Sequence, residues 1–451
     1  MLTLLLLAQS ASLTSFPKDL QLYPRDAAGF GAVEVAGSVD SPGYLSADLY
    51  VYRDDVLWHS ESQPLTYSGG SAPFAMTVSI PAELAEYDFA LYAFDGASSD
   101  PLDAAQDVVA GDVYLVQGQS NAVAADWAAE DLGNSSQREW IRSYGTASTT
   151  GSSVINDTDW GLAEGERSNQ HCTIGQWGLR MAQLLVDKGQ IPVCVLNGAV
   201  SGTPITYHLR NDADPMNVNT NYGRLLYRAA QAGVQGAAKA ILWYQGESDG
   251  DRYEAYSINF ADLYADWLSD YSAVEKVYVF QIHNGCGAPS QRLRELQRRF
   301  DDLYPRVDVL STTEAPEHDG CHYRYSGYRE LGDRAALVLG RDFYASPVTK
   351  NIDAPNIDYA YYSTPQQDEI TLVFRDPDDT LIWEPGAEAR FTLRPVGSVL
   401  GGVVSGNSIV LDLGGPATAT SISYDYPAGE AAGIVNGRGI GALTFYRARI
   451  Q

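Results

Sequence analysis

The chain has 451 residues, 45% of them hydrophobic and 19% charged, and its 57 acidic residues against 30 Lys and Arg give a formal net charge of -27. This length and balance predict a globular protein of roughly two to four domains with a sizeable buried core. The negative charge disfavours nucleic acids and anionic membrane surfaces, and no stretch beyond the N-terminus approaches the ~18 apolar residues of a membrane span, so we expect neither nucleic acid binding nor membrane insertion.

Residues 1–16 are expected to be a secretory leader segment. An apolar run is followed by small residues, with Ala8 and Ser10 at the two small positions before a cleavage point near Ala11. The basic start of such leaders is missing, since Lys18 is the first positively charged residue. This segment predicts a secreted or periplasmic protein.

The four cysteines leave several pairings open. None lies in a C-x-x-C pair, so neither a zinc ribbon nor a thioredoxin motif is expected. Cys194 lies in the apolar run 191–196, where a buried free thiol is the simplest interpretation. Cys286 and Cys321 lie in glycine-containing loops, and a bridge between them is the favoured pairing in an oxidising compartment.

Residues 17–106 are predicted to form an N-terminal β-sandwich-like domain. Short alternating runs at 33–36, 47–52 and 89–94 are separated by turn signals such as Ser41-Pro-Gly43.

Residues 107–346 change character and predict an α/β domain. Apolar runs alternate with stretches whose apolar residues recur at three- and four-residue steps. The runs are 113–116, 193–196, 240–244, 277–281 and 307–310, and the helical stretches are 177–186, 222–233, 253–268, 290–303 and 326–339. This alternation predicts a parallel sheet with helices on both faces, and such sheets bind ligands at the carboxyl ends of their strands.

Residues 347–451 are predicted to form a second β-sandwich-like domain. Strand patterns at 369–374, 389–393, 408–412 and 421–425 are separated by turns that contain glycine or proline.

The first candidate motif is Gly118-Gln-Ser-Asn121, directly after the first predicted strand of the α/β domain. The glycine allows a tight turn that exposes the Ser120 hydroxyl, which needs an adjacent base to act as a nucleophile. The alternative is an ordinary helix start capped by serine.

The second motif, Asp319-Gly-Cys-His322, supplies a base. At this spacing, the Asp319 carboxylate and the His322 imidazole can lie on one side of a turn, where the carboxylate orients the ring and stabilises its charged form. An Asx-turn with a surface histidine is the alternative.

Two further motifs follow predicted strands. Trp243-Tyr-Gln-Gly-Glu-Ser-Asp249 places the Gln245 amide where it could stabilise an oxyanion, with two acids for positioning or substrate contact. Asn197-Gly-Ala-Val-Ser-Gly-Thr203 has small residues whose backbone N–H groups could approach a ligand. Singly, each is also compatible with an ordinary loop.

Together these motifs resemble the SGNH hydrolase superfamily, and within it the sialate O-acetylesterase-like carbohydrate esterases. That group has Gly-Gln-Ser-Asn, a Gly-Gly-Ser/Thr loop, Trp-x-Gln-Gly-Glu-x-Asp and a late Asp-x-x-His, and the resemblance covers roughly residues 111–344. It implies a flavodoxin-like three-layer α/β/α domain, here flanked by β domains. It also implies removal of O-acetyl groups from sugars or polysaccharides without a metal or organic cofactor.

The resemblance implies that Ser120 is the nucleophile, His322 the general base and acid, and Asp319 the orienting carboxylate. The oxyanion would be held by the Ser120 N–H, the Gln245 side chain and an N–H of Ser201 or Gly202, where this sequence has a serine in place of the group's first glycine. Further side chains are expected around the substrate, and these are Gln119, Asn121, Glu247, Asp249, Tyr207 and His208.

Two alternatives to a secreted carbohydrate acetylesterase remain at this stage. One is a lipid or aryl esterase on the same scaffold, and the other is a carbohydrate-binding protein without activity. The sequence does not specify the sugar or the oligomeric state. Its acidic balance disfavours polyanions, although the arginines at 292, 294, 298 and 299 could form a local basic site in place of a solvated helix face.

Overall fold

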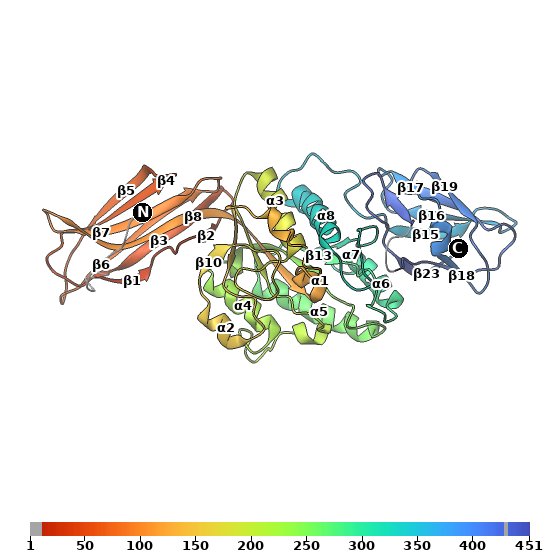
Figure 1. The fold of residues 1–451 in the computed structure, drawn as a ribbon, viewed down its shortest axis with the longest axis horizontal. Helices are drawn as coiled ribbons and strands as arrows, with labels where there is room; N and C mark the ends of the chain where they lie inside the picture. Colours follow the sequence, from red (N-terminus) through yellow and green to blue (C-terminus); the bar gives the residue numbers. More distant parts are fainter. Residues whose placement is uncertain (1–10, 428–431) are drawn as a thin grey trace.

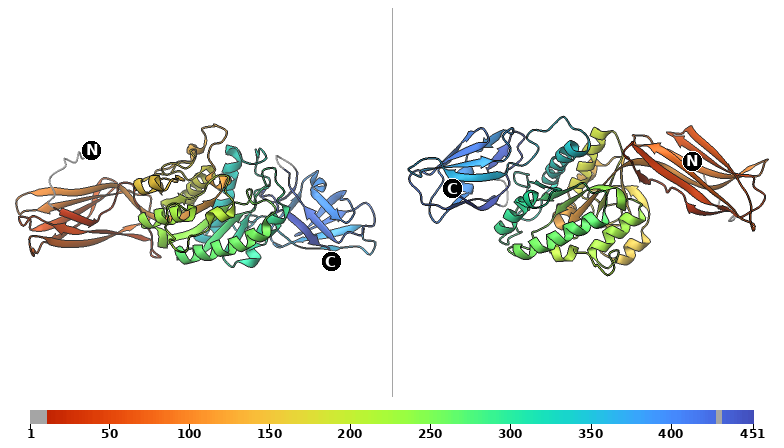
Figure 2. Two further views of the ribbon diagram at one scale, coloured as in Figure 1. Left: turned by 90° about the horizontal axis from the view of Figure 1, so that it is seen from below. Right: turned by 180° about the vertical axis from the view of Figure 1, so that it is seen from behind.

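The computed structural model describes residues 11–427 and 432–451 and shows three parts in a row: an N-terminal β domain, a central α/β domain and a C-terminal β domain (Figures 1 and 2). The predicted fold class is confirmed, with a parallel sheet covered by helices and flanked by β-sheet regions. Within the described residues, no helix is long and apolar enough to cross a membrane.

The N-terminal domain packs two antiparallel sheets around an apolar core. One sheet has the order β1-β3-β6, and β5, β4, β7 and the start of β8 form the other. Alternation explains the packing, because Phe74, Met76 and Val78 of β6 point inward and the residues between them are exposed. The strands are β1 (Ala11–Ser15), β2 (Leu22–Pro24), β3 (Phe30–Val39), β4 (Ser46–Arg53), β5 (Val56–Pro64), β6 (Ala72–Pro81), β7 (Tyr87–Phe94) and β8 (Ser99–Gly118).

The start of this domain differs from the predicted boundary. Residues 1–10 of the predicted leader lie outside the described residues, whereas Ala11–Ser15 form β1 and pair with β3. The folded domain therefore includes residues 11–16, which the sequence pattern had assigned to the leader.

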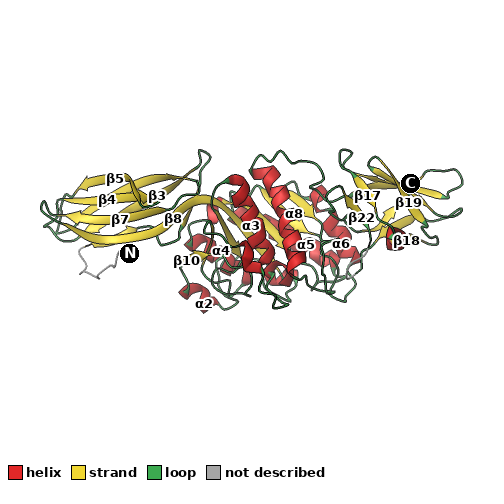
Figure 3. Ribbon diagram, turned by 45° about the horizontal axis from the view of Figure 1, so that its top comes forward, coloured by secondary structure: helices red, strands yellow, loops and turns green. Residues whose placement is uncertain are grey.

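Strand β8 joins the first two domains as a single strand of 20 residues (Figure 3). Its first part pairs with β7, and its last part pairs with β11 and β12 of the central sheet. The predicted boundary at 106/107 therefore falls inside a strand. No turn residues mark this boundary, because the chain stays extended while β8 changes its neighbours from β7 to β11 and β12.

The central sheet has the order β10-β9-β11-β8-β12-β13-β14, and all five predicted strands are present. Strands β11, β8, β12, β13 and β14 are parallel, whereas β10 at the edge is antiparallel to β9. Because helices cover both faces, β11 is buried along its whole length. The new strands are β9 (Ile141–Tyr144), β10 (Trp160–Leu162), β11 (Val193–Asn197), β12 (Ala238–Tyr244), β13 (Lys276–Phe280) and β14 (Val307–Leu310).

Helices α3 and α8 pack together on one side of this sheet, and α4 and α5 lie on the other (Figure 1). The helix predicted over 290–303 is two helices, because Arg299 leaves the helical conformation with φ of -101° and ψ of 7°. The α-helices are α1 (Ser120–Val123), α2 (Gly151–Asn156), α3 (Gln176–Gly189), α4 (Asn221–Gln231), α5 (Tyr253–Asp270), α6 (Gln291–Arg298), α7 (Phe300–Leu303) and α8 (Tyr325–Phe343). Short 3-10 turns are η1 (Gly133–Ser136), η2 (Ile205–His208), η3 (Gln235–Ala237) and η4 (Ala387–Arg390).

The C-terminal domain contains a four-stranded sheet of order β15-β16-β20-β19, a three-stranded sheet of order β18-β21-β23 and the pair β17-β22. The run at 389–393 is only partly a strand, since Ala389 and Arg390 belong to η4. The strands are β15 (Ile357–Tyr362), β16 (Glu369–Phe374), β17 (Leu381–Trp383), β18 (Phe391–Arg394), β19 (Gly401–Ser405), β20 (Ser408–Asp412), β21 (Ser421–Tyr424), β22 (Ile434–Asn436) and β23 (Phe445–Arg449).

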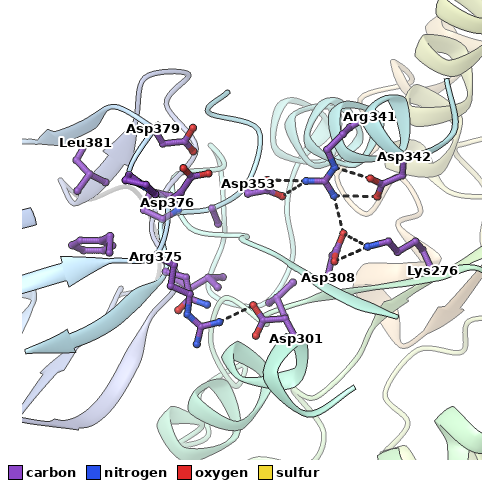
Figure 4. A pocket seen from close by; sticks show the side chains of 17 residues that line it. Lys276, Asp301, Asp308, Arg341, Asp342, Asp353, Arg375, Asp376, Asp379 and Leu381 are labelled. Carbon is purple, nitrogen blue, oxygen red and sulfur yellow. Dashed lines mark hydrogen bonds and ion pairs between the residues drawn. The ribbon is translucent and has the colours of Figure 1, made fainter. Parts of the chain in front are cut away.

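Ion pairs bind this domain to the central one around a cavity of about 580 Å³ (Figure 4). Arg375 contacts Asp301 at 2.9 Å and Asp302 at 2.8 Å, and Arg341 contacts Asp353 at 2.8 Å. The cavity lies near Lys276, the first residue of β13, and so at the sheet edge opposite the carboxyl ends of the strands. None of the predicted site residues lines it.

Asp112 of β8 is a buried carboxylate between two cations, Arg25 at 2.7 Å and Lys239 at 2.7 Å. Burial opposes its charged form, but the two cations outweigh burial and hold the pKa below the ordinary value. Replacing Asp112 with alanine should lower the free energy of unfolding by about 3 kcal/mol, because both cations lose their partner. Urea unfolding near neutral pH measures this.

The exposed Asp187→Ala serves as the control for Asp112, with an expected change within about 0.5 kcal/mol. Because the folded-state pKa of Asp112 is lowered, its contribution is present above the unfolded-state pKa and is lost as pH falls through the folded-state value. Equal stability of the two variants would contradict this account.

Candidate active site

The backbone turn at the end of β8 places Ser120 at the carboxyl edge of the sheet. Gly118 has φ of +140°, and a Cβ there would lie 2.1 Å from the carbonyl oxygen of Tyr244, so only glycine fits. Helix α1 then begins at Ser120, which is buried, with only 5% of its surface exposed. The predicted tight turn is present, and its cause is the close approach of β12.

The Ser120 hydroxyl lies next to His322, although they are about 200 residues apart in the chain. Nε2 of His322 is 3.0 Å from Oγ of Ser120, which is hydrogen-bond distance. Burial lowers the pKa of His322, and the charge of Asp319 opposes that shift. The imidazole is therefore predominantly neutral near pH 7 and able to accept a proton.

Asp319 shapes the loop that carries His322. Its Oδ1 accepts the backbone N–H groups of Cys321 and His322, both at 2.8 Å. Burial opposes ionisation of Asp319, but these N–H groups outweigh burial and hold its pKa below the ordinary value. Among the described residues, no hydrogen bond joins this carboxylate to the imidazole ring, so it acts on the ring through its charge.

Three contacts tie the His322 loop to its surroundings. The disulfide Cys286–Cys321 joins it to the loop after β13, which confirms the favoured pairing, and Cys172 and Cys194 are buried free thiols. Nδ2 of Asn121 donates to the carbonyl oxygen of Cys321 at 2.9 Å. The indole of Trp127 packs against the His322 ring with centroids 5.4 Å apart. These contacts position the histidine beside the serine.

Asn121 is the polar centre behind Ser120. Its Nδ2 also donates to Oε1 of Glu247 at 2.7 Å, and its Oδ1 accepts the hydroxyl of Tyr328 at 3.0 Å. The indole N–H of Trp177 donates to its backbone carbonyl at 2.8 Å. Asn121 and Glu247 therefore support the structure of the site. Such positioning was one of the two roles predicted for Glu247, the other being substrate contact.

The Gln245 amide lies behind the cavity rather than in its wall. Its Nε2 donates to Oδ2 of Asp249 at 2.6 Å, to the Thr203 carbonyl at 3.1 Å and to Oε1 of Gln119 at 3.2 Å. Because these acceptors use its donor capacity and its side chain is fully buried, Gln245 does not present an N–H to Ser120 in this structure. Asp249 orients Gln245, and Gln245 orients Gln119.

The backbone N–H groups of Ser120, Ser201 and Gly202 are among those that have no acceptor within the described part of the chain. The N–H of Val200 is bonded to the Gly118 carbonyl at 2.9 Å and anchors the Ser201 loop. Gly202 has φ of +72°, which favours glycine. These groups surround a cavity of about 350 Å³ lined by Gln119, Ser120, Trp127, Ser201, Gly202, Glu247, Ser248, Cys286, Cys321 and His322.

Four of the six side chains expected around the substrate do not line this cavity, and these are Asn121, Asp249, Tyr207 and His208. His208 is fully buried and bonded to Thr203 and Asn221 at 2.8 Å and 2.9 Å, and burial lowers its pKa to about 3. Tyr207 is 42% exposed but does not line the cavity. His208 thus supports the loop from inside, because its ring packs against Trp243 of β12.

Sequence reasoning missed Trp127, Ser248 and the disulfide as parts of the cavity wall. Ser248 lies inside the motif Trp243–Asp249, so the sequence alone could have predicted that it lies near the site. Trp127 belongs to an irregular segment after α1 that has no motif, and only folding brings it against His322. Among the described residues, no group of three or more His, Cys, Asp or Glu side chains could hold a metal ion.

The central parallel sheet, with a cavity at the carboxyl ends of its strands, has the arrangement of an α/β enzyme. A family model described as "Carbohydrate esterase, sialic acid-specific acetylesterase" matches residues 110–339, more than half of the chain. The chain belongs to this family, and it is a carbohydrate acetylesterase, that is, a carboxylic ester hydrolase.

A solved structure shows the same fold. A carbohydrate acetylesterase from Xanthomonas citri is similar over 96% of this chain and 99% of its own, with a TM-score of 0.64 and 16% identity. A protein from Arabidopsis thaliana is similar over 51% of this chain and 98% of its own, with a TM-score of 0.41 and 20% identity. No curated protein matches the chain.

Proposed function

We propose that the enzyme removes O-acetyl groups from carbohydrates through a Ser120–His322–Asp319 triad and an acyl-enzyme. The observation that carries this proposal is the 3.0 Å separation between Nε2 of His322 and Oγ of Ser120 in the wall of a cavity. A serine hydroxyl needs such a base, and here the base is neutral near pH 7.

In the first half of the reaction, His322 takes the hydroxyl proton as Oγ of Ser120 attacks the acetyl carbonyl carbon. The tetrahedral intermediate collapses as the bond to the sugar oxygen breaks, and His322 gives its proton to that oxygen. In the second half, His322 takes a proton from water, the hydroxide attacks the acetyl-serine, and acetate leaves as the proton returns to Ser120.

The oxyanion is held by the backbone N–H of Ser120 together with that of Ser201 or Gly202. These groups have no competing acceptor among the described residues, and each such donor is worth about 3 kcal/mol in comparable enzymes. In this proposal Gln245 supports Gln119, in place of the direct role that the family resemblance implied.

The function is tested by measuring acetate release from acetylated oligosaccharides and from an aryl acetate. We expect acetate from both, at rates that depend on enzyme concentration. An enzyme that releases no acetate from either would overturn the esterase proposal, and one that cleaves only the aryl ester would overturn the carbohydrate assignment.

The pH dependence of the rate reports on His322. Because the pKa of His322 is lowered, kcat/KM should rise with pH through a value below the ordinary 6.5 or so and then level off. Asp319→Asn should lower kcat by about 10²- to 10⁴-fold and move this rise to still lower pH, because the Asp319 charge raises the histidine pKa.

Rates of wild type and Asp319→Asn measured between pH 4 and pH 9 test this role of the carboxylate. A variant profile that coincides with the wild-type profile would show that Asp319 has no electrostatic influence on His322. The exposed Asp187→Asn should retain the wild-type profile.

We also propose that the protein is secreted or periplasmic. The Cys286–Cys321 disulfide is of a kind that persists in oxidising compartments, and residues 1–10 have the apolar and small residues of a secretory leader. Detection of the protein in the cytoplasm with reduced Cys286 and Cys321 would overturn this proposal.

A further inference from the structure

Trp127 is the one large apolar side chain among the described residues that line the catalytic cavity. This residue is 43% exposed. Single exposed hydrophobic residues are ordinary on protein surfaces, and Trp58 of β5 is exposed to the same extent in the N-terminal domain. The feature that sets Trp127 apart is its position in the cavity wall, beside Ser120 and His322.

Hydrogen bonds fix the orientation of the Trp127 indole. Its Nε1 donates to the hydroxyl of Tyr328 at 3.2 Å, and this fully buried tyrosine donates to Oδ1 of Asn121 at 3.0 Å. The backbone before the indole is held as well, since the N–H of Asp126 donates to the carbonyl oxygen of Glu166 at 2.7 Å. The protein thus satisfies the polar atom of the indole, and the rest of the ring is an apolar surface held in place before a ligand binds.

The contact with His322 indicates which part of the substrate meets this surface. The indole and imidazole rings have centroids 5.4 Å apart, with an angle of 35° between their planes. In the mechanism above, His322 gives its proton to the departing sugar oxygen, so that oxygen lies beside the imidazole when the ester bond breaks. The acetyl oxygen points instead to the N–H groups that hold the oxyanion. The sugar ring joined to the departing oxygen is therefore brought next to Trp127.

The cavity has room for such a ring. Its volume of about 350 Å³ lies within the range of roughly 300 to 1,000 Å³ of sites that bind small organic ligands, whereas an acetyl group needs far less. A pyranose ring has hydroxyls around its rim and C–H groups on its faces, and these C–H groups leave water favourably against a flat aromatic surface. Sγ of Cys321 lies 3.8 Å from Nε2 of His322, so the disulfide continues the apolar wall.

We propose that Trp127 binds the sugar ring of the substrate by stacking against its C–H face, and so selects acetylated sugars over esters whose alcohol part has no ring. This inference rests on the acetylesterase function proposed above. One part of the indole supports His322, and the exposed part covers the sugar ring. The contact acts on the reaction because the stacked ring holds the departing oxygen beside His322.

The test compares kcat/KM for an acetylated xylo-oligosaccharide and for trifluoroethyl acetate, whose small alcohol part has no ring. In Trp127→Leu, the ratio of the first value to the second should fall at least about tenfold, because leucine is apolar but offers no flat surface. Weaker support of His322 lowers both values alike and cancels in the ratio. An unchanged ratio would overturn the inference, even where both activities fall.

Two further variants serve as comparisons. Trp127→Phe retains a flat ring and should keep the ratio within about threefold of wild type. The matched control is Trp58→Leu, which removes an indole of the same exposure from a residue that does not line the cavity, and its ratio should equal that of wild type. An equal fall in Trp58→Leu, or a fall in Trp127→Phe as large as in Trp127→Leu, would contradict the stacking role.

Binding is measured apart from catalysis in Ser120→Ala, which has no nucleophile. Its affinity for the acetylated xylo-oligosaccharide, measured by isothermal titration calorimetry, should fall at least about tenfold when Trp127→Leu is added. Equal affinities of the single and double variants would overturn the inference and leave the esterase function intact. Cleavage of trifluoroethyl acetate alone by wild type would also overturn the inference, and no acetate from either ester would overturn the proposed function as well.

Discussion

Replacing Ser120 with alanine is expected to reduce acetate release by at least about 10⁴-fold without unfolding the protein. The hydroxyl makes one side-chain hydrogen bond in the described structure, to His322, so its removal leaves the core unchanged. What is lost is the nucleophile itself. The remaining cavity binds and polarises the ester but has no group placed to form the acyl-enzyme.

Steady-state rates with an aryl acetate measure the loss of activity, and thermal unfolding by circular dichroism tests whether the stability is unchanged. The control is Ser152→Ala on α2, an exposed serine whose loss should change neither activity nor stability. A fluorophosphonate should label wild type on the peptide that contains Ser120 and should not label the Ser120→Ala variant. Activity of the variant within about tenfold of wild type would assign the nucleophile elsewhere.

The second large effect is expected from removal of the disulfide. In the double variant Cys286→Ser, Cys321→Ser, the free energy of unfolding should fall by about 3 to 4 kcal/mol, because the bridge closes a loop of sequence separation 35. The activity of the folded variant should fall about 10- to 100-fold, since Cys321 precedes His322 and a small displacement of the base weakens catalysis strongly.

Urea unfolding and aryl acetate kinetics test this expectation together. The double variant avoids leaving one reactive thiol, and it also serves as the control for reductant. Dithiothreitol should lower the activity of wild type toward that of the double variant and should have no effect on the double variant itself. Full activity of reduced wild type would show that Asn121 and Asp319 alone hold the His322 loop.

Much of the site was predictable because its reactive residues lie in short sequence motifs. Ser120 begins α1 just after β8, and Asp319 and His322 lie between β14 and α8; the carboxyl ends of parallel strands meet at one edge. The fold class followed from the alternation of buried strands and amphipathic helices. The Cys286–Cys321 pairing was favoured because both cysteines lie in glycine-containing loops, and the structure contains this disulfide.

Other parts depended on contacts between distant segments. Gln245 was expected at the oxyanion, but Asp249 and Thr203 use its donor, and Gln119 faces the cavity instead. His208 was expected against the sugar, but its ring is fully buried and packs on Trp243. Which side of a loop faces inward depends on the neighbours it packs against, and no local pattern records this.

The sequence by itself determined the α/β class, the order of the strands along the chain and the residue types available for acyl transfer, because these follow from local periodicity and short motifs. The tertiary structure alone decided that β8 is shared by two sheets, that Trp127 packs on His322, and that Asn121 and Asp319 hold the loop that carries His322. These features arise from packing and hydrogen bonding between segments far apart in the chain, which set the direction of each side chain only once the fold is complete.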